Sequence, residues 1–229
     1  MLYLPNKNHC SNPIFSKLTT LRKIIQDNTF FLLPYVLVIS IASIFLGTLG
    51  NSGLFFIINN AHSPVADHFF LYITHLGDAV VAFSLALLLI VVSIRNSLTF
   101  LIITLILAIV VTVLKRGVFP ELVRPVEYFR EMETVRLVDG YEPPGLYTFP
   151  SGHSATAYSI SLYLSFLIRH RWLKLLLFVL ALLVSFSRIY LSAHFPADVI
   201  AGSLIAIIVT TLGYWVSLKY NNPWLGKRL

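Results

Sequence analysis

Six apolar runs of 15 to 22 residues constrain the fold of this chain more than any other feature of its sequence. A transmembrane helix needs about 20 apolar residues, and only helices or closed barrels can satisfy the backbone inside a bilayer. The composition agrees, since 57% of the 229 residues are hydrophobic and only 12% are charged. The sequence therefore predicts an all-α membrane protein, a bundle of six transmembrane helices. The expected spans cover approximately residues 30–49, 79–94, 98–114, 154–168, 172–190 and 197–218.

The segments between these runs suggest one domain. Residues 1–27 are polar, with no apolar core and small-residue cleavage site, so we expect a cytoplasmic segment and no cleaved signal peptide. Residues 28–218 would form the six-span domain, and residues 219–229 a cytoplasmic tail. Within the domain, we expect residues 50–77 to form an interfacial or re-entrant piece, with Asp78 capping the second span. Residues 117–149 form the one long hydrophilic loop.

Basic residues are distributed unevenly between the two sides that six spans define. If both termini lie inside, 11 of the 17 Lys and Arg residues fall on the inner side. Only one of the ten acidic residues, Asp27, falls on that side. Inner loops of membrane proteins carry such an excess of positive charge. We therefore expect the termini in the cytoplasm, and loop 117–149 on the outer face of the cell (inner) membrane, which in a double-membrane cell is the periplasmic face. The net charge of +7 then reflects topology, and we expect no nucleic-acid partner.

The segment between the last two spans carries three chemically useful side chains, Arg188, His194 and Asp198. Ionisable groups at membrane depth are costly and usually functional. Pro196 is typical of a first helical position, so Asp198 would lie in the first turn and reach back to His194. A carboxylate on one ring nitrogen fixes the tautomer and leaves the other nitrogen as base or nucleophile. The plainer alternative is a helix–turn–helix corner with an Asp cap and a snorkelling Arg.

Two further polar groups are expected at the same outer level. Ser151, Gly152 and His153 stand where the long loop meets the fourth span, and a helix start of this kind binds anions through its free N–H groups. A simple capping turn with a surface histidine is the alternative. Lys115 and Arg116 end the third span, and Arg124 follows in the loop; such residues are usually interfacial anchors.

Positive groups and two histidines together indicate phosphoryl transfer by covalent catalysis. No cluster of Asp, Glu or His has a spacing suited to a metal, and Cys10 is the only cysteine. We therefore expect no metal and no cofactor.

The order of these motifs resembles the three-part signature of the type 2 phosphatidic acid phosphatase family. The matching stretches are Lys…Arg-Pro, then Pro-Ser-Gly-His at 150–153, then Ser-Arg…His…Asp at 187–198. The family consists of six-span lipid phosphatases whose fold is shared with vanadium haloperoxidases. One departure is a longer first motif, in which eight residues separate Lys115 from Arg124, so either Lys115 or Arg116 could contact phosphate.

The resemblance implies a role for each matching residue. His194 would be the nucleophile that forms a phosphohistidine, and Asp198 would orient its ring. His153 would protonate the leaving oxygen and then activate water. The phosphate oxygens would be held by the remaining matches: Lys115 or Arg116, Arg124, Arg188, Ser151 and the N–H of Gly152.

The leading hypothesis is thus a metal-independent phosphatase acting on a lipid phosphate or pyrophosphate, with membrane lipids around it. A lipid phosphotransferase with the same site is an alternative, and a non-catalytic scaffold or transporter is another. Transporters place polar residues in mid-span, whereas here they stand at span ends. Phosphatidate, phosphatidylglycerol phosphate, undecaprenyl pyrophosphate and lipid A phosphate all remain open as substrates, and the sequence leaves the oligomeric state undetermined.

Overall fold

The computed structural model describes residues 13–132 and 135–219, in which helices are the only regular secondary structure. The N-terminal half contains α1 (Pro13–Asp27), α2 (Thr29–Asn60), α3 (Pro64–Ile73), the 3₁₀ turn η1 (Thr74–Gly77), α4 (Ala79–Val92), α5 (Ile94–Val113) and the π-helical turn η2 (Leu114–Val118). The C-terminal half contains the short α6 (Pro125–Tyr128), α7 (Gly152–Leu167), α8 (Arg171–Tyr190) and α9 (Pro196–Ser217). The predicted all-α class is therefore confirmed. Residues 1–12 of the expected N-terminal segment, with Cys10, and residues 220–229 of the expected tail lie outside the described residues.

Four of the described helices are long and apolar enough to cross a bilayer: α2, α5 continued by η2, α8 and α9. A fifth candidate is the pair of α3–η1 and α4, which are bent by 53° at Asp78. Helix α7, at 16 residues, is shorter than a typical span. These four to five candidate spans make the chain a membrane protein.

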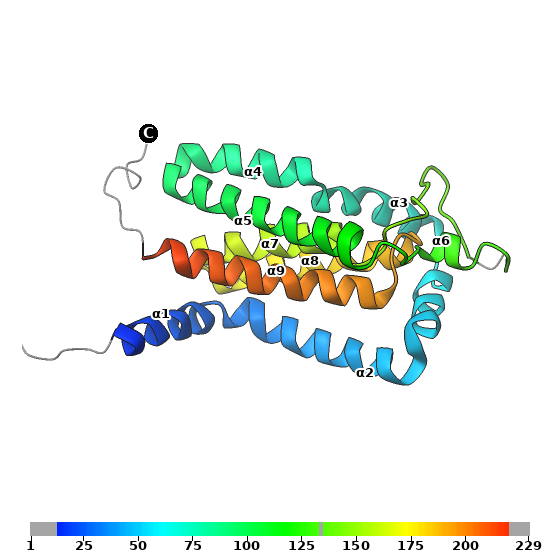
Figure 1. Cartoon of the computed structure of the whole chain (residues 1–229), viewed down its shortest axis with the longest axis horizontal. Helices are drawn as coiled ribbons and strands as arrows, with labels where there is room; N and C mark the ends of the chain where they lie inside the picture. The colour runs from blue at the N-terminus through cyan, green and yellow to red at the C-terminus, as the bar shows by residue number, and fades with distance from the viewer. Residues whose placement is uncertain (1–12, 133–134, 220–229) are drawn as a thin grey trace, which may run out of the picture.

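Helix α7 lies at the centre of the bundle and packs against α8, α9, α5 and α4 (Figure 1). Most of its buried residues are small, among them Ser154, Ala155, Ala157 and Ser159, although Tyr158 and Tyr163 are buried too. Small residues let helix backbones approach closely where no hydrophobic effect drives their association. The sequence of α7 is thus suited to a helix surrounded by other helices.

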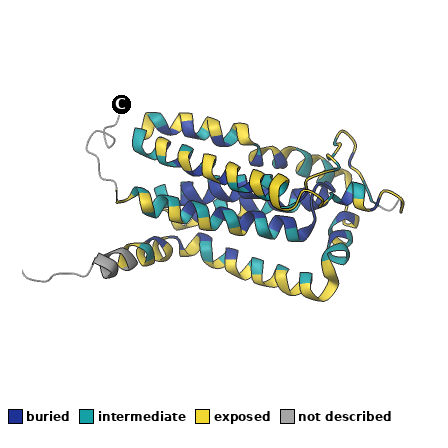
Figure 2. Cartoon of the chain, viewed as in Figure 1, coloured by how far each residue is buried: buried dark blue, intermediate teal, exposed yellow. Residues whose placement is uncertain are grey.

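The outer helices are exposed along much of their length (Figure 2), and many of their exposed residues are large and apolar. Leu37 and Ile44 on α2, Leu88 on α4 and Ile109 on α5 are all exposed. A soluble monomer rarely exposes large apolar side chains along several helices at once, whereas a surface that faces lipid requires them. The burial pattern therefore supports the membrane assignment independently of hydropathy.

The two ends of the bundle differ in character. Helix α1 and the end of α9 lie together at one end, whereas α3, α6 and the long loop lie at the other (Figure 1). The loop between the last two long helices, residues 191–195, also lies at the second end, next to the start of α7. The motifs singled out in the sequence are thus gathered at one end of the molecule.

Residues 50–77 are mostly helical. Helix α2 bends at Gly50, whose φ of 71° suits glycine, and continues to Asn60 before α3 begins. The interfacial or re-entrant placement of this segment stays a prediction. One predicted boundary needs correction. Helix α5 begins at Ile94, four residues before the expected start of the third span at residue 98, so that Arg95 lies within the helix. The reason is Ser93, whose hydroxyl accepts a hydrogen bond from the Asn96 N–H and so caps α5 at once after α4.

Candidate active site

His194 lies in the loop between α8 and α9, and only 1% of the residue is exposed. Its Nδ1 lies 3.4 Å from Oδ2 of Asp198, which also accepts a hydrogen bond of 2.9 Å from the N–H of Phe195. Pro196 occupies the first turn of α9, as the sequence predicted, and this places Asp198 one helical turn beyond the ring. With Nδ1 directed to the carboxylate, Nε2 is the nitrogen left for a substrate.

Thr148 completes this buried group and was missed in the sequence. Its hydroxyl donates a hydrogen bond to Oδ2 of Asp198 and lies 3.3 Å from Nδ1 of His194. The side chain is buried, at the end of the long loop two residues before Pro150. The contact joins residues 50 positions apart, so no local pattern could have revealed it.

Arg188 is buried in the last turn of α8, with 2% of the residue exposed. Its Nη1 donates to the Thr74 hydroxyl and its Nη2 to the Tyr141 hydroxyl, both at 2.7 Å. Its Nε is buried without a hydrogen-bond partner. A buried guanidinium held by two hydroxyls, with no carboxylate in the described ion pairs, retains its full positive charge for an anion.

Arg124 and Lys115 are held by carbonyl groups rather than by acids. Arg124 donates from Nη1 to the carbonyl of Ala193 and from Nε to that of Leu146, both at 3.1 Å. Lys115 donates from Nζ to the carbonyl of Tyr147 at 2.9 Å. Backbone carbonyls orient these cations without neutralising them, so the positive charge of the site is preserved.

Arg116, the alternative to Lys115, points elsewhere. It is exposed and its guanidinium lies over the ring of Tyr147, 5.6 Å from the centroid. Lys115 instead is half-buried and lies close enough to Arg124, Arg188 and Asp198 to interact with them electrostatically. The structure brings Lys115 to the group of cations and leaves Arg116 outside it.

The surroundings of His194 favour its neutral form. Burial is the largest cause that lowers the pKa of His194 well below its usual 6.5, and the nearby charges of Arg124, Arg188 and Lys115 lower it further. A neutral imidazole retains the lone pair that a nucleophile or base requires. The ring is therefore in the reactive state at neutral pH.

The Ser151-Gly152-His153 segment begins α7 as the sequence predicted. Ser151 is the N-cap, and its hydroxyl accepts from the N–H and the hydroxyl of Ser154. Its own N–H donates to the Asp198 carbonyl at 2.9 Å, which joins the start of α7 to α9. Gly202 makes this contact feasible, because a Cβ there would lie 2.4 Å from the Ser151 carbonyl oxygen.

His153 has a carboxylate partner that the sequence did not indicate. Its Nε2 lies 2.8 Å from Oδ1 of Asp78, whose Oδ2 lies 2.9 Å from Nδ1 of His75. Asp78 occupies the N-cap position of α4, as predicted, but makes no side-chain capping bond. The expectation that its carboxylate caps the helix is therefore wrong, because the two histidines occupy its oxygens.

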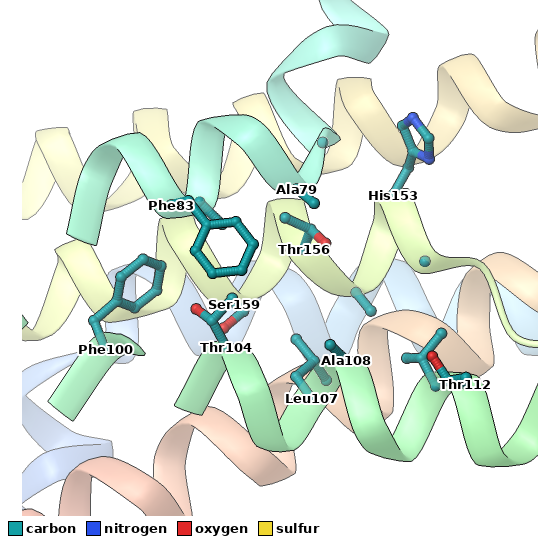
Figure 3. Close-up of a pocket in the computed structure, with 15 residues that line it drawn as sticks. Ala79, Phe83, Phe100, Thr104, Leu107, Ala108, Thr112, His153, Thr156 and Ser159 are labelled. Carbon is teal, nitrogen blue, oxygen red and sulfur yellow. The ribbon is translucent and has the colours of Figure 1, made fainter. Parts of the chain in front are cut away.

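An apolar pocket of about 280 Å³ opens beside His153 (Figure 3). It lies between α4, α5 and α7, with His153 and Gly152 in its lining and Phe83 and Phe100 further along the helices. Thr104 and Ala108 line it from α5, and their small side chains leave the space open (Figure 3). The polar site thus continues directly into a hydrocarbon-lined space.

No group of three or more His, Cys, Asp or Glu side chains within residues 13–132 and 135–219 has the geometry of a metal site. Positive charge near His194 comes from Lys115, Arg124 and Arg188 instead. The site can hold an anion, offer a neutral imidazole to it, and place a second histidine nearby.

Residues 96–222 match the sequence profile of the PAP2 superfamily. A lipid A 4′-phosphatase of Porphyromonas gingivalis is 34% identical over 103 residues, which cover 45% of this chain and 43% of that protein. An undecaprenyl-diphosphatase of Sulfolobus acidocaldarius is 40% identical over 74 residues, 32% of each chain. These alignments therefore span less than half the length of the curated relatives. The crystal structure of Aquifex aeolicus LpxE is similar at a TM-score of 0.64 and 35% identity, over 74% of this chain and 95% of that one.

Proposed function

The chain belongs to the PAP2 superfamily, and we propose that it is a metal-independent membrane phosphatase that hydrolyses a lipid phosphate or pyrophosphate monoester. The observation that carries the proposal is the convergence of Lys115, Arg124 and Arg188 on a buried, neutral His194. None of these three cations takes part in the ion pairs among the described residues. Asp198 and Asp78 lie near enough to act on these three cations but form an ion pair with none of them. Three unpaired cations in a largely buried site are costly unless an anion binds there. A phosphoryl group is such an anion, and its transfer needs mainly positioning and charge stabilisation.

In the first step, Nε2 of His194 attacks phosphorus, and a P–N bond forms as the bond to the ester oxygen breaks. His153, as imidazolium, gives its proton to that leaving oxygen. Asp198 and Thr148 hold the attacking ring through its Nδ1 side and stabilise the positive charge that develops on it. The product is a phosphohistidine and a free lipid alcohol or lipid phosphate.

In the second step, water attacks the phosphohistidine while His153, now neutral, accepts its proton. The P–N bond breaks, inorganic phosphate leaves, and both histidines return to their starting states. Lys115, Arg124 and Arg188, with Ser151 and the N–H of Gly152, stabilise the transferring phosphoryl group in both steps. Donors placed at developing charge are typically worth about 10²–10³-fold in rate each.

The apolar pocket beside His153 favours a lipid over a soluble phosphate ester. A hydrocarbon chain lying between α4, α5 and α7 would place its headgroup next to His153 and Gly152. The curated relatives that match the chain are named for activity on lipid A and undecaprenyl diphosphate, which supports the same substrate class.

For topology we propose six spans with both termini inside: α2, the bent pair α3–η1 and α4, α5, α7, α8 and α9. Residues 28–218 would form the phosphatase domain, flanked by cytoplasmic segments 1–27 and 219–229. The site would then open to the outer, periplasmic face of the inner membrane. The excess of basic residues at the end that holds α1 and the end of α9 supports this orientation.

Purified protein tested against phosphatidate, phosphatidylglycerol phosphate, undecaprenyl pyrophosphate and lipid A phosphate tests the proposal, with release of inorganic phosphate as the readout. We expect release from at least one of them, unaffected by EDTA, inhibited by vanadate and abolished by His194→Ala. Absence of release from every lipid, or complete loss in EDTA with rescue by Mg²⁺, would refute the proposed activity.

A further inference from the structure

The turn at residues 74–78, to which the sequence assigned no chemical role, lies directly against the site. Thr74 is buried in η1, and its hydroxyl accepts the 2.7 Å hydrogen bond from Nη1 of Arg188. Four residues later, Asp78 contacts His153. One short turn therefore contacts both a proposed phosphate-binding residue and the proposed general acid.

Gly77 allows this close approach. A Cβ at this position would lie 2.9 Å from the His153 carbonyl oxygen and 2.9 Å from Cγ1 of Val184. Distances below 3.0 Å are too short for a real Cβ, so any other residue would push the turn away from α7 and α8. The absence of a side chain at Gly77 is what brings the carboxylate of Asp78 within reach of His153.

Asp78 faces one ring nitrogen of His153, as Asp198 faces one of His194, but the nitrogen is Nε2 in His153 and Nδ1 in His194. Its Oδ1 lies 2.8 Å from Nε2 of His153, and its Oδ2 is occupied by His75, whose exposed ring lies 2.9 Å away. A carboxylate on one ring nitrogen places the proton there and leaves the opposite nitrogen for chemistry. For His153 that opposite nitrogen is Nδ1.

We propose that Asp78 is the positioning residue of His153, and that Thr74–Asp78 is a fourth catalytic motif supplementing the three in the family signature. Asp78 holds the Nε2–H of His153, so that Nδ1–H donates the proton to the leaving oxygen in the first step. In the second step the same Nδ1 accepts the proton of the attacking water, while Nε2–H stays on the carboxylate throughout. This inference rests on the proposed function.

The carboxylate also offsets an electrostatic problem. Burial is the largest effect that disfavours a charged His153, and the charged groups among the described residues that act on it include Asp78 and the cations Arg188 and Arg124. The two cations disfavour the imidazolium that must protonate the leaving group, whereas the negative charge of Asp78 favours it. Removing that charge should impair the acid step without altering how Lys115, Arg124 and Arg188 bind phosphate.

The test compares Asp78→Asn with the wild-type protein on two substrates that differ in leaving group. The measured quantity is the single-turnover rate of phosphoenzyme formation, because the second step is common to both substrates. With a lipid alkyl phosphate, which needs a proton on its leaving oxygen, we expect this rate to fall by about 10²-fold, at the lower end for general acid catalysis. With an activated aryl phosphate the loss should be less than about tenfold. In a His153→Ala background, Asp78→Asn should cause no further loss, since its partner is already absent. Asp78→Glu should restore part of the alkyl phosphate rate.

Asp67→Asn is the matched control, because Asp67 is a carboxylate of the preceding helix whose partners are structural. It pairs with Arg136 and accepts from the Tyr190 hydroxyl. Its removal should lower both substrate rates by the same factor, through folding alone. The tautomer can also be read without any Asp78 variant, from the ¹⁵N spectrum of histidine-labelled protein, in which the His153 signals are those missing from His153→Ala. We expect a proton on Nε2 of neutral His153.

The outcomes separate the two proposals. If wild-type protein releases no phosphate from any lipid, the proposed function fails. If the wild type is active but Asp78→Asn matches it, slows both substrates equally, or adds to His153→Ala, the role of Asp78 is refuted. A proton on Nδ1 of neutral His153 would refute it as well, whether or not the variant folds.

Discussion

The two histidines have different partners and should therefore fail differently when removed. His194 is buried with Asp198 and Thr148, whereas His153 is about one third exposed at its side chain and faces Asp78. His194→Ala should abolish both turnover and the phosphoenzyme, because no P–N bond can form. His153→Ala should reduce turnover by about 10²–10⁴-fold, with a smaller loss for an activated leaving group. Quenched-flow trapping with ³²P-labelled substrate measures both. An acid-labile, base-stable phosphoenzyme that persists in His194→Ala and is lost in His153→Ala would reverse the assignment.

Lys115 and Arg116 offer a neighbouring pair with the same charge and different locations. Lys115 reaches the carbonyl of Tyr147 beside the cations of the site, whereas Arg116 is exposed over the Tyr147 ring. Lys115→Ala should lower kcat/KM by about 10²-fold, the typical loss for one donor to a transition-state anion. Arg116→Ala should change it by less than about threefold, because an exposed cation is well screened. Equal losses in the two variants, measured by phosphate release, would contradict the placement of Lys115.

Among single residues, the sequence was informative where the contact is local. Pro196 and Asp198 predicted the start of α9, and Ser151 predicted the start of α7, because capping is decided within one turn. The contacts of Asp78 with His153 and of Thr148 with Asp198 were missed, since these partners lie 75 and 50 positions apart and meet only through helix packing. Which of Lys115 and Arg116 faces the other cations was also undecidable, because adjacent residues at the end of a helix differ only in direction.

At the scale of helices, the apolar runs predicted α7, α8 and α9 to within two residues at each end. Hydropathy was a weaker guide to α2 and α3, where a mixed composition concealed helices that continue beyond Gly50. Hydropathy also gave no indication that α4, α5 and α7 leave a space between them. That space depends on which side of α5 carries small residues such as Thr104 and Ala108, because these line the gap toward α4 and α7.

Filling the space between these helices tests whether it holds a hydrocarbon chain. Ala108→Phe adds a ring to the pocket wall, whereas Ile109→Phe adds one on an exposed position of the same helix that does not line the pocket. We expect Ala108→Phe to raise KM for a long-chain lipid phosphate by about tenfold or more, as steric exclusion of several methylenes would, at about 0.8 kcal/mol each. A short-chain soluble phosphate should be unaffected, and Ile109→Phe should change neither value. An unchanged KM for the long-chain lipid in Ala108→Phe would show that the chain binds elsewhere, and a loss shared equally by the two substrates would contradict a role specific to the chain.

For the whole molecule, the distribution of charge predicts an orientation in the membrane. The described end that holds α1 and the end of α9 carries Arg171, while the opposite end carries the site and the loop that contains Asp139. In the proposed six-span topology, 11 of the 17 basic residues would lie on the side of the termini, so the site end should face outward. Both Asp139 and Arg171 are exposed, and each can be replaced by cysteine in a chain whose native Cys10, outside the described residues, is changed to serine. In intact cells, an impermeant thiol reagent should label Asp139→Cys and leave Arg171→Cys unlabelled until the membrane is permeabilised.

The cysteine-free parent is the control for background labelling, and phosphate release confirms that each variant is folded. The reverse labelling pattern would place the site in the cytoplasm and invert the topology, while labelling of both positions from outside would exclude six spans with the termini on the inner side.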